Sequence, residues 1–132
     1  LSLVAGAVLL RPRVTGQAVD EGRLGDRPIG RTGVLVDVNA DYRIAALPGI
    51  SIDMRVVHEG TRTARADNSL DIPARTVVDI GARYRTTVGK IPTVVRLQAR
   101  NVGNVYGWRV FGGGGFAPMP GRRILASLTA DF

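Results

Sequence analysis

The sequence predicts an all-β fold, an antiparallel up-and-down meander of about six strands. Apolar and polar residues alternate along several segments, whereas helical periodicity is poor. The 17 Gly and 7 Pro residues disfavour long helices. One short pattern of apolar, polar, Ala, charged and aromatic residues recurs at 38–42, 80–84 and 128–132.

The predicted strands follow from period-2 alternation, which places apolar residues on one face of a strand and polar residues on the other. The first predicted strand, 1–14, alternates weakly. The strongly alternating strands are 34–44, 50–60, 76–85, 93–102 and 122–132. Their polar faces carry charges of both signs, which we interpret mainly as a salt-bridge ladder between neighbouring strands. These residues are Asp37, Asp41, Asp53, Arg55, Asp79, Arg83, Arg96 and Arg100.

The connections between the predicted strands alternate in length. Residues 45–49 and 86–92 are short turns that contain Pro and Gly. Residues 15–33, 61–75 and 103–121 are long, polar and rich in Gly. Short turns at one end and long loops at the other are typical of outer-membrane barrels. The chain is therefore predicted to form part of a transmembrane β-barrel.

Aromatic residues lie at both predicted ends of the strands. Tyr42, Tyr84 and Phe132 close the apolar faces at the short-turn end, and Tyr106 and Trp108 lie at the long-loop end. Girdles of aromatic side chains mark the two membrane interfaces of such barrels. We therefore expect these residues to lie at the membrane interfaces.

The composition disfavours several classes of function. Without Cys there is no disulfide framework and no Cys-based metal or redox site. His58 and Glu59 are strand neighbours that point to opposite faces, so they do not chelate one ion together. Serines without a nucleophile-elbow context give no support to a hydrolase, including one of the outer-membrane phospholipase kind. We predict no enzyme activity, no cofactor and no metal site.

The net charge of +7 does not indicate nucleic-acid binding. The arginines are spread along the chain, many alternate with apolar residues, and none forms a basic run. We predict no nucleic-acid partner and expect the basic residues to face anionic ligands or lipid phosphates.

Four motifs resemble one family of membrane receptors. They are 39–43, 76–84, 96–102 with Tyr106, and 120–123 leading into 127–132. These segments resemble the C-terminal end of a TonB-dependent outer-membrane receptor of the ferric-siderophore type. The resemblance covers 34–132 well and 14–28 more loosely. The resemblance implies that residues 1–132 are the C-terminal portion of that receptor's β-barrel, part of a large transmembrane β-barrel, without the plug domain, and we expect a fragment.

The resemblance implies a transport function in the bacterial cell outer membrane. The whole receptor would take up a ferric siderophore, with energy from the TonB protein acting through the missing N-terminal region. Outer-membrane lipid and lipopolysaccharide would surround the barrel. The loops 61–75 and 103–121 would contribute to ligand recognition. Phe132 would be part of the assembly signal that the outer-membrane insertion machinery reads.

Two alternatives remain open from the sequence. A soluble β-barrel that binds a small ligand also shows alternating strands. A smaller outer-membrane barrel, such as an autotransporter translocator, also ends in an aromatic residue.

Overall fold

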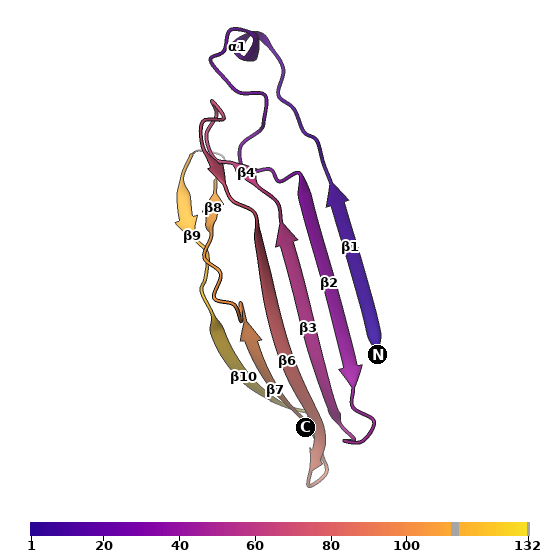
Figure 1. Cartoon of the computed structure of the whole chain (residues 1–132). Coiled ribbons are helices and arrows are strands. Elements are labelled where there is room, and N and C mark those ends of the chain that lie inside the picture. Colours follow the sequence, from indigo (N-terminus) through magenta and orange to yellow (C-terminus); the bar gives the residue numbers. More distant parts are fainter. Residues whose placement is uncertain (112–113, 132) are drawn as a thin grey trace.

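A single curved antiparallel sheet dominates the computed structural model (Figure 1), which describes residues 1–111 and 114–131. The sheet has six strands in the order β1-β2-β3-β6-β7-β10. Its strands are β1 (Ser2–Leu9), β2 (Val34–Arg43), β3 (Ile50–Glu59), β6 (Arg75–Val88), β7 (Ile91–Arg100) and β10 (Arg123–Ala130). Each strand pairs with its successor in the sheet, which confirms the predicted meander.

The connections divide between the two ends of the sheet as predicted (Figure 1). Short turns join β2 to β3 and β6 to β7 at one end, and the long loops gather at the other. These loops contain small elements that the alternation did not predict. They are α1 (Gln17–Asp20), the paired strands β4 (Arg62–Thr63) and β5 (Asp71–Ile72), and the paired strands β8 (Trp108–Val110) and β9 (Phe116–Pro118).

Two strand boundaries differ from the prediction by three residues or more. The hairpin between β6 and β7 is longer, because Thr86, Thr87 and Val88 continue the ladder opposite 91–93. Only Gly89 and Lys90 form its turn, and Gly89 takes a positive φ of 67°. The first strand is shorter, since β1 ends at Leu9 and the chain then leaves the sheet towards α1.

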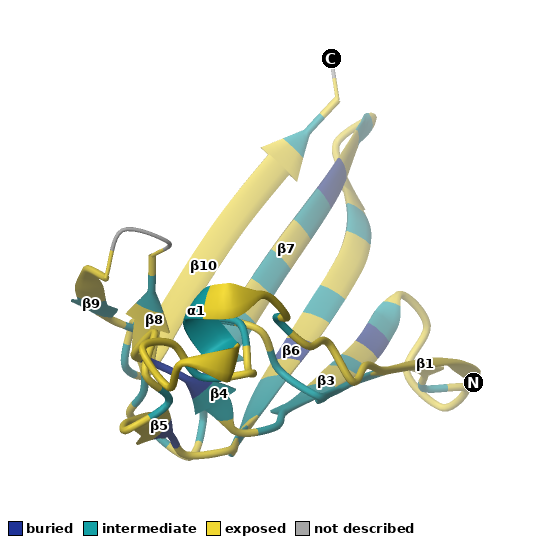
Figure 2. Ribbon diagram, turned by 90° about the horizontal axis from the view of Figure 1, so that it is seen from above, coloured by how far each residue is buried: buried dark blue, intermediate teal, exposed yellow. Residues whose placement is uncertain are grey.

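The sheet is a single layer, and no element covers either of its faces within the described residues. Figure 2 shows exposed and half-buried residues along the strands. The buried apolar residues are Ala64 and Ile72, and both belong to the loop region rather than to the sheet. Leu3, Ile124 and Leu128 are 65%, 74% and 71% exposed. A soluble domain would bury such a face against a second layer.

In the part of the chain that the structure describes, no helix is long and apolar enough to cross a membrane.

Candidate membrane wall and loop surface

The strand register gathers the apolar residues of all six strands on one face of the sheet. Side chains directly opposite each other in neighbouring strands share a face. Val38 therefore lies beside Val56, which lies beside Val78, and the same register continues through β7 to β10. The face formed in this way is the lipid-facing candidate. It includes Leu3, Ala5, Val36, Val38, Ala40, Met54, Val56, Val78, Ile80, Val95, Leu97, Ala126 and Leu128.

Two of the predicted girdle residues lie on this apolar face. Tyr42 on β2 lies directly opposite Ile52 on β3, near the short-turn end of the sheet. Tyr84 on β6 lies directly opposite Ile50 on β3. Their side chains are exposed, at 51% and 44%. Tyr84 stands inside its strand rather than at its end, because β6 extends to Val88.

The other girdle candidates lie in the connection from β7 to β10 or outside the described residues. Tyr106 and Trp108 are 80% and 52% exposed, and Trp108 begins β8 at the loop end (Figure 1). Phe132 lies outside the described residues, so its place in the girdle and its role in assembly stay predictions. The interface role of the four described aromatic residues also remains a prediction.

The opposite face carries charged side chains, and part of the predicted ladder forms. Arg55 on β3 makes an ion pair with Asp37 on β2, and Asn39 donates to the same carboxylate at 2.9 Å. Asp53 on β3 pairs with Arg96 on β7, whose Nη2 donates to both carboxylate oxygens at 3.1 Å. Both pairs join different strands of the sheet.

The Asp53–Arg96 pair crosses an intervening strand, and Gly81 makes this crossing possible. Gly81 on β6 lies directly opposite Asp53 on β3. A Cβ atom at position 81 would stand 2.6 Å from Oδ2 of Asp53, so any side chain there would displace the carboxylate. The predicted ladder did not include this glycine, because alternation alone does not show which side chain lies across a neighbouring strand.

The other four residues of the predicted ladder do not continue it. Asp79 Oδ1 accepts a hydrogen bond of 2.7 Å from the backbone N–H of Asn101. Among the described residues, Asp41, Arg83 and Arg100 make no ion pair. The predicted ladder is therefore confirmed for two ion pairs and wrong for these four residues.

Asn101 organises the turn that follows β7. Its backbone takes a left-handed conformation with φ 51°, and its side chain is buried at 6% exposure. Oδ1 accepts from the Val105 N–H at 2.8 Å, while Nδ2 donates to the carbonyls of Val105 at 3.0 Å and Pro120 at 3.3 Å. One side chain thus links the start and the end of the long connection to β10.

The loop 10–33 and the β4–β5 hairpin are joined by Asn68. The side-chain amide of Asn68 pairs with the backbone of Arg27, accepting from its N–H at 2.8 Å and donating to its carbonyl at 2.9 Å. Gly25 lies against the same amide, since a Cβ there would stand 2.1 Å from Cγ of Asn68. An ion pair of 2.9 Å between Arg27 and Asp71 adds a second link.

Two further ion pairs lie at the loop end of the sheet, one from β3 to β4 and one from β3 to β6. Glu59, the last residue of β3, accepts from Arg62 at 2.6 Å and from Arg75 at 2.5 Å. His58, on the apolar face, instead contacts the Thr76 hydroxyl through Nδ1 at 2.9 Å. His58 and Glu59 thus have separate partners, as their opposite faces predicted. Within the described residues, no cluster of metal-binding side chains forms.

A positively charged hollow opens beside the loops. It has a volume of about 280 Å³ and lies between the end of β1, the loop 10–33 and the β4 region. Its charged lining residues are Arg11, Arg13, Arg27, Arg31 and Asp26. A hollow with this excess of guanidinium groups favours anionic ligands over cations.

Hydrogen bonds lower the pKa of one loop carboxyl group. The backbone N–H and the hydroxyl group of Ser69 donate to Asp67 at 3.0 and 2.7 Å, and these bonds hold the pKa of Asp67 below its usual value. Hydrogen bonds to a carboxylate favour its charged form.

Comparison with known proteins relates this sheet and its loops to two receptors. No family model matches the chain. In sequence it is 26% identical over 132 residues to the ferrichrome receptor FcuA of Yersinia enterocolitica, a match that covers 98% of this chain and 17% of that protein. In structure it matches BauA, the ferric preacinetobactin receptor of Acinetobacter baumannii, with a TM-score of 0.87 and 22% identity. That match covers 98% of this chain and 20% of the receptor.

The chain therefore spans about a fifth or less of the length of the receptors that it matches. Over nearly its whole length it is similar to one segment of a ferric-siderophore receptor, as the motifs predicted.

Proposed function

We propose that this chain is a segment of the wall of an outer-membrane receptor that takes up ferric siderophores. The whole receptor binds the chelate on its outer side and transports it into the periplasm without making or breaking covalent bonds. The TonB protein supplies the energy through a part of the receptor outside these residues. The relatives are named as receptors for ferric chelates, which supports transport rather than catalysis.

The observation that carries this proposal is the single-layer sheet with one apolar and one charged face. In a membrane barrel the apolar face contacts lipid and the polar face lines the interior. Each of the six strands carries at least one exposed large apolar or aromatic side chain, while ion pairs lie on the other face. A soluble barrel that binds a small ligand would place apolar side chains inside and charges outside, and it offers no explanation for the long match to the receptors.

Each part of the segment then has a role in the receptor. The apolar face contacts outer-membrane lipid, and the loop end faces the outside, next to lipopolysaccharide. The joined loops 10–33 and 61–75 and the connection 103–121 contribute to the surface that the chelate meets. Tyr42 and Tyr84 lie at the periplasmic interface, with Tyr106 and Trp108 towards the outer interface. Phe132 contributes to recognition by the insertion machinery.

Iron uptake by the full-length protein tests this proposal. The receptor that carries this segment is expressed in a bacterial strain without siderophore receptors of its own, once with TonB and once without it. Radioactive iron is supplied as ferrichrome, as ferric preacinetobactin and as a panel of other ferric chelates. We expect the receptor in the outer-membrane fraction and uptake of at least one chelate only in the strain that has TonB. A correctly assembled receptor that binds and transports no chelate would contradict the proposal.

A further inference from the structure

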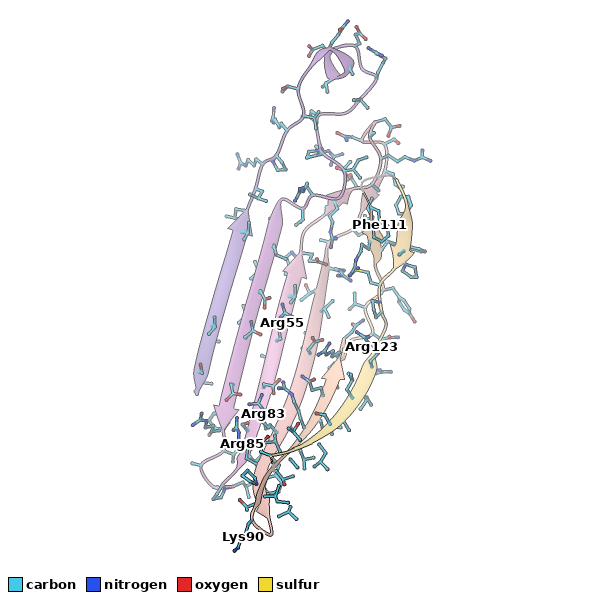
Figure 3. All side chains as sticks on the ribbon, turned by 180° about the vertical axis from the view of Figure 1, so that it is seen from behind. Arg55, Arg83, Arg85, Lys90, Phe111 and Arg123 are labelled. Atoms are coloured by element: carbon cyan, nitrogen blue, oxygen red, sulfur yellow. The ribbon has the colours of Figure 1, made fainter. Side chains whose placement is uncertain are left out.

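Two arginines lie opposite each other on the charged face at the loop end of the last two strands. Arg100 is the last residue of β7, and it lies directly opposite Arg123, the first residue of β10 (Figure 3). We call them the loop-end arginine pair. Among the described residues, neither makes an ion pair. Like charges directly opposite each other destabilise a sheet, and a bound anion would offset this cost.

The loop-end arginine pair lines a hollow of about 270 Å³. The hollow is bounded by the loop ends of β3, β6, β7 and β10 and by residues 119–121, and its lining contains four arginines and two acidic residues. Both acidic residues have other partners. Glu59 accepts from Arg62 and Arg75, and Asp79 accepts from the N–H of Asn101. The hollow therefore offers guanidinium groups that lack a carboxylate partner.

Two asparagines hold the loop side of this hollow in place. Nδ2 of Asn101 donates to the Pro120 carbonyl at 3.3 Å, and Oδ1 of Asn104 accepts from the Arg122 N–H at 2.9 Å. Gly121 lies close to the same Oδ1, since a Cβ there would stand 3.1 Å from it. The backbone just before Arg123 is thus fixed by side chains from the turn after β7. A site formed in advance loses less conformational entropy when it binds a ligand.

Two further hollows continue the positive charge along the loop end of the sheet. One of about 270 Å³ shares Glu59 with the first, and the hollow beside the loop 10–33 shares Leu10 and Arg31 with it. The three hollows are lined by nine arginines and three acidic residues. The arginines that make no ion pair among the described residues are Arg11, Arg13, Arg31, Arg100 and Arg123. Clefts with one sign of charge raise the local concentration of ligands of the opposite sign.

We propose that the loop-end arginine pair binds an anionic group of the ferric chelate, so that the receptor prefers negatively charged chelates to neutral ones. This inference rests on the proposed function, which places the loop end outside the cell and the charged face inside the barrel. Hydroxamate groups balance the charge of the ferric ion and leave a neutral chelate, whereas carboxylate or catecholate groups leave a net negative charge. Guanidinium groups bind carboxylates with two parallel hydrogen bonds, and charge-assisted bonds of this kind are strong.

Equilibrium binding to the full-length receptor in outer membranes tests this inference. The probes are radioactive ferric trihydroxamate, which is neutral, and ferric citrate and ferric tris-catecholate, which are anionic. We expect the unsubstituted receptor to bind one of the anionic chelates more tightly than the neutral chelate. Arg100→Gln and Arg123→Gln should each raise the Kd for that anionic chelate about tenfold, because each removes a charged hydrogen-bond donor. The Kd for the neutral chelate should change less than about twofold.

The controls separate this site from a general loss of charge. Arg83→Gln removes an arginine without an ion pair from the same face of β6, nearer the short-turn end, and should leave every Kd unchanged. Arg100→Lys keeps the positive charge and should retain part of the affinity for the anionic chelate. Gel mobility of unheated samples verifies that each variant is assembled. Added sodium chloride gives a test without any variant, since it should weaken binding of the anionic chelate alone.

Three results would overturn the inference in assembled receptors. They are tighter binding of the neutral chelate by the unsubstituted receptor, equal losses for neutral and anionic chelates, and no loss in either glutamine variant. The last result is expected if the pair holds inorganic phosphate or a lipopolysaccharide phosphate instead of the chelate. Each of these results leaves the transport proposal intact, because a chelate is still bound. A receptor that binds no chelate at all would overturn both proposals.

Discussion

At position 81 of β6, the absence of a side chain lets the Asp53 carboxylate lie across the strand and reach Arg96. The contribution of this contact depends on burial, and both side chains are about one-quarter to one-third exposed, at 26% and 31%. Solvent therefore screens the pair, and we expect a modest effect on the free energy of unfolding.

We predict that Gly81→Ala lowers the free energy of unfolding of the full-length receptor by about 0.5–1 kcal/mol, because the new Cβ displaces the carboxylate. The matched control is Gly6→Ala on the same face of β1, where a Cβ meets no atom within 4 Å. That control should be neutral or slightly stabilising, since alanine is less flexible than glycine. Urea titration followed by gel mobility measures both. In an Asp53→Ala background the cost of Gly81→Ala should vanish, and an unchanged cost would show that the ion pair is not its cause.

Asn101 combines a left-handed backbone with a buried and fully bonded side chain, so two costs should be separable there. Asn101→Ala loses the side-chain hydrogen bonds and also strains the backbone, and we expect a loss of about 2–4 kcal/mol. Asn101→Gly keeps the backbone free of strain and should lose about 1–3 kcal/mol. Urea titration of the two variants checks the order. Equal stability of both variants would show that the backbone conformation carries no cost.

The lowered pKa of Asp67 predicts a pH dependence of the β4–β5 loop. The folded loop binds the charged carboxylate better than the unfolded loop does. This stabilisation is therefore complete above the ordinary carboxyl pKa of 3.8 and is lost as the pH falls through the lower folded value. Hydrogen exchange of the Ser69 amide should be slow at neutral pH and faster, relative to its intrinsic rate, in strong acid. Asp67→Asn should remove most of this change, and an unaltered profile in that variant would contradict the assignment.

At the scale of the elements, the sheet and the loops differ in how well the sequence predicted them. The meander and the faces of its strands agree with the alternation, because a half-buried strand needs a period of two. The β8–β9 hairpin was not predicted. Its strands span only 108–110 and 116–118, which is too short to show a pattern, and Pro118 disfavours a strand. The predicted end of β6 is too early, because the sequence places Thr86 to Val88 in the turn, whereas the turn contains only Gly89 and Lys90.

The cost of a charge on the apolar face should depend on its depth in the membrane. Ile80 lies in the middle of β6, whereas Tyr84 lies nearer the turn end of the same face. We expect Ile80→Arg to destabilise the assembled receptor by about 2–4 kcal/mol and Tyr84→Arg by about 0–1 kcal/mol. Thr87→Arg, on the charged face of the same strand, is the control and should be nearly neutral. Folding titrations in lipid vesicles give these values. Equal costs at positions 80 and 84 would count against an interface position for Tyr84.

At the scale of the whole molecule, the segment lacks the features that let a chain fold alone in water. Among the described residues, β1 and β10 each have one partner strand and one open edge. The large apolar face is uncovered as well. Open edges and exposed apolar faces promote aggregation in water, and open sheet edges are not tolerated in lipid.

We therefore predict that residues 1–132, expressed alone, are insoluble in plain buffer and give a β-rich far-ultraviolet circular dichroism spectrum in detergent. The full-length receptor is the control, since its barrel closes these edges. Fractionation with and without detergent, followed by circular dichroism, is the measurement. A soluble monomer that melts cooperatively in plain buffer would contradict the membrane-wall assignment and support the soluble-barrel alternative.

The sequence by itself determined the fold class, the two faces of the sheet and the end at which the long loops gather. These properties depend on local alternation and on the spacing of Gly and Pro, which are properties of short segments. Only the tertiary structure decided which groups meet: the Asp53 and Arg96 side chains across Gly81, and the Asn68 side chain with the backbone of Arg27. Such contacts depend on the register between strands and on how far a side chain extends across its neighbours, and neither can be read from one strand alone.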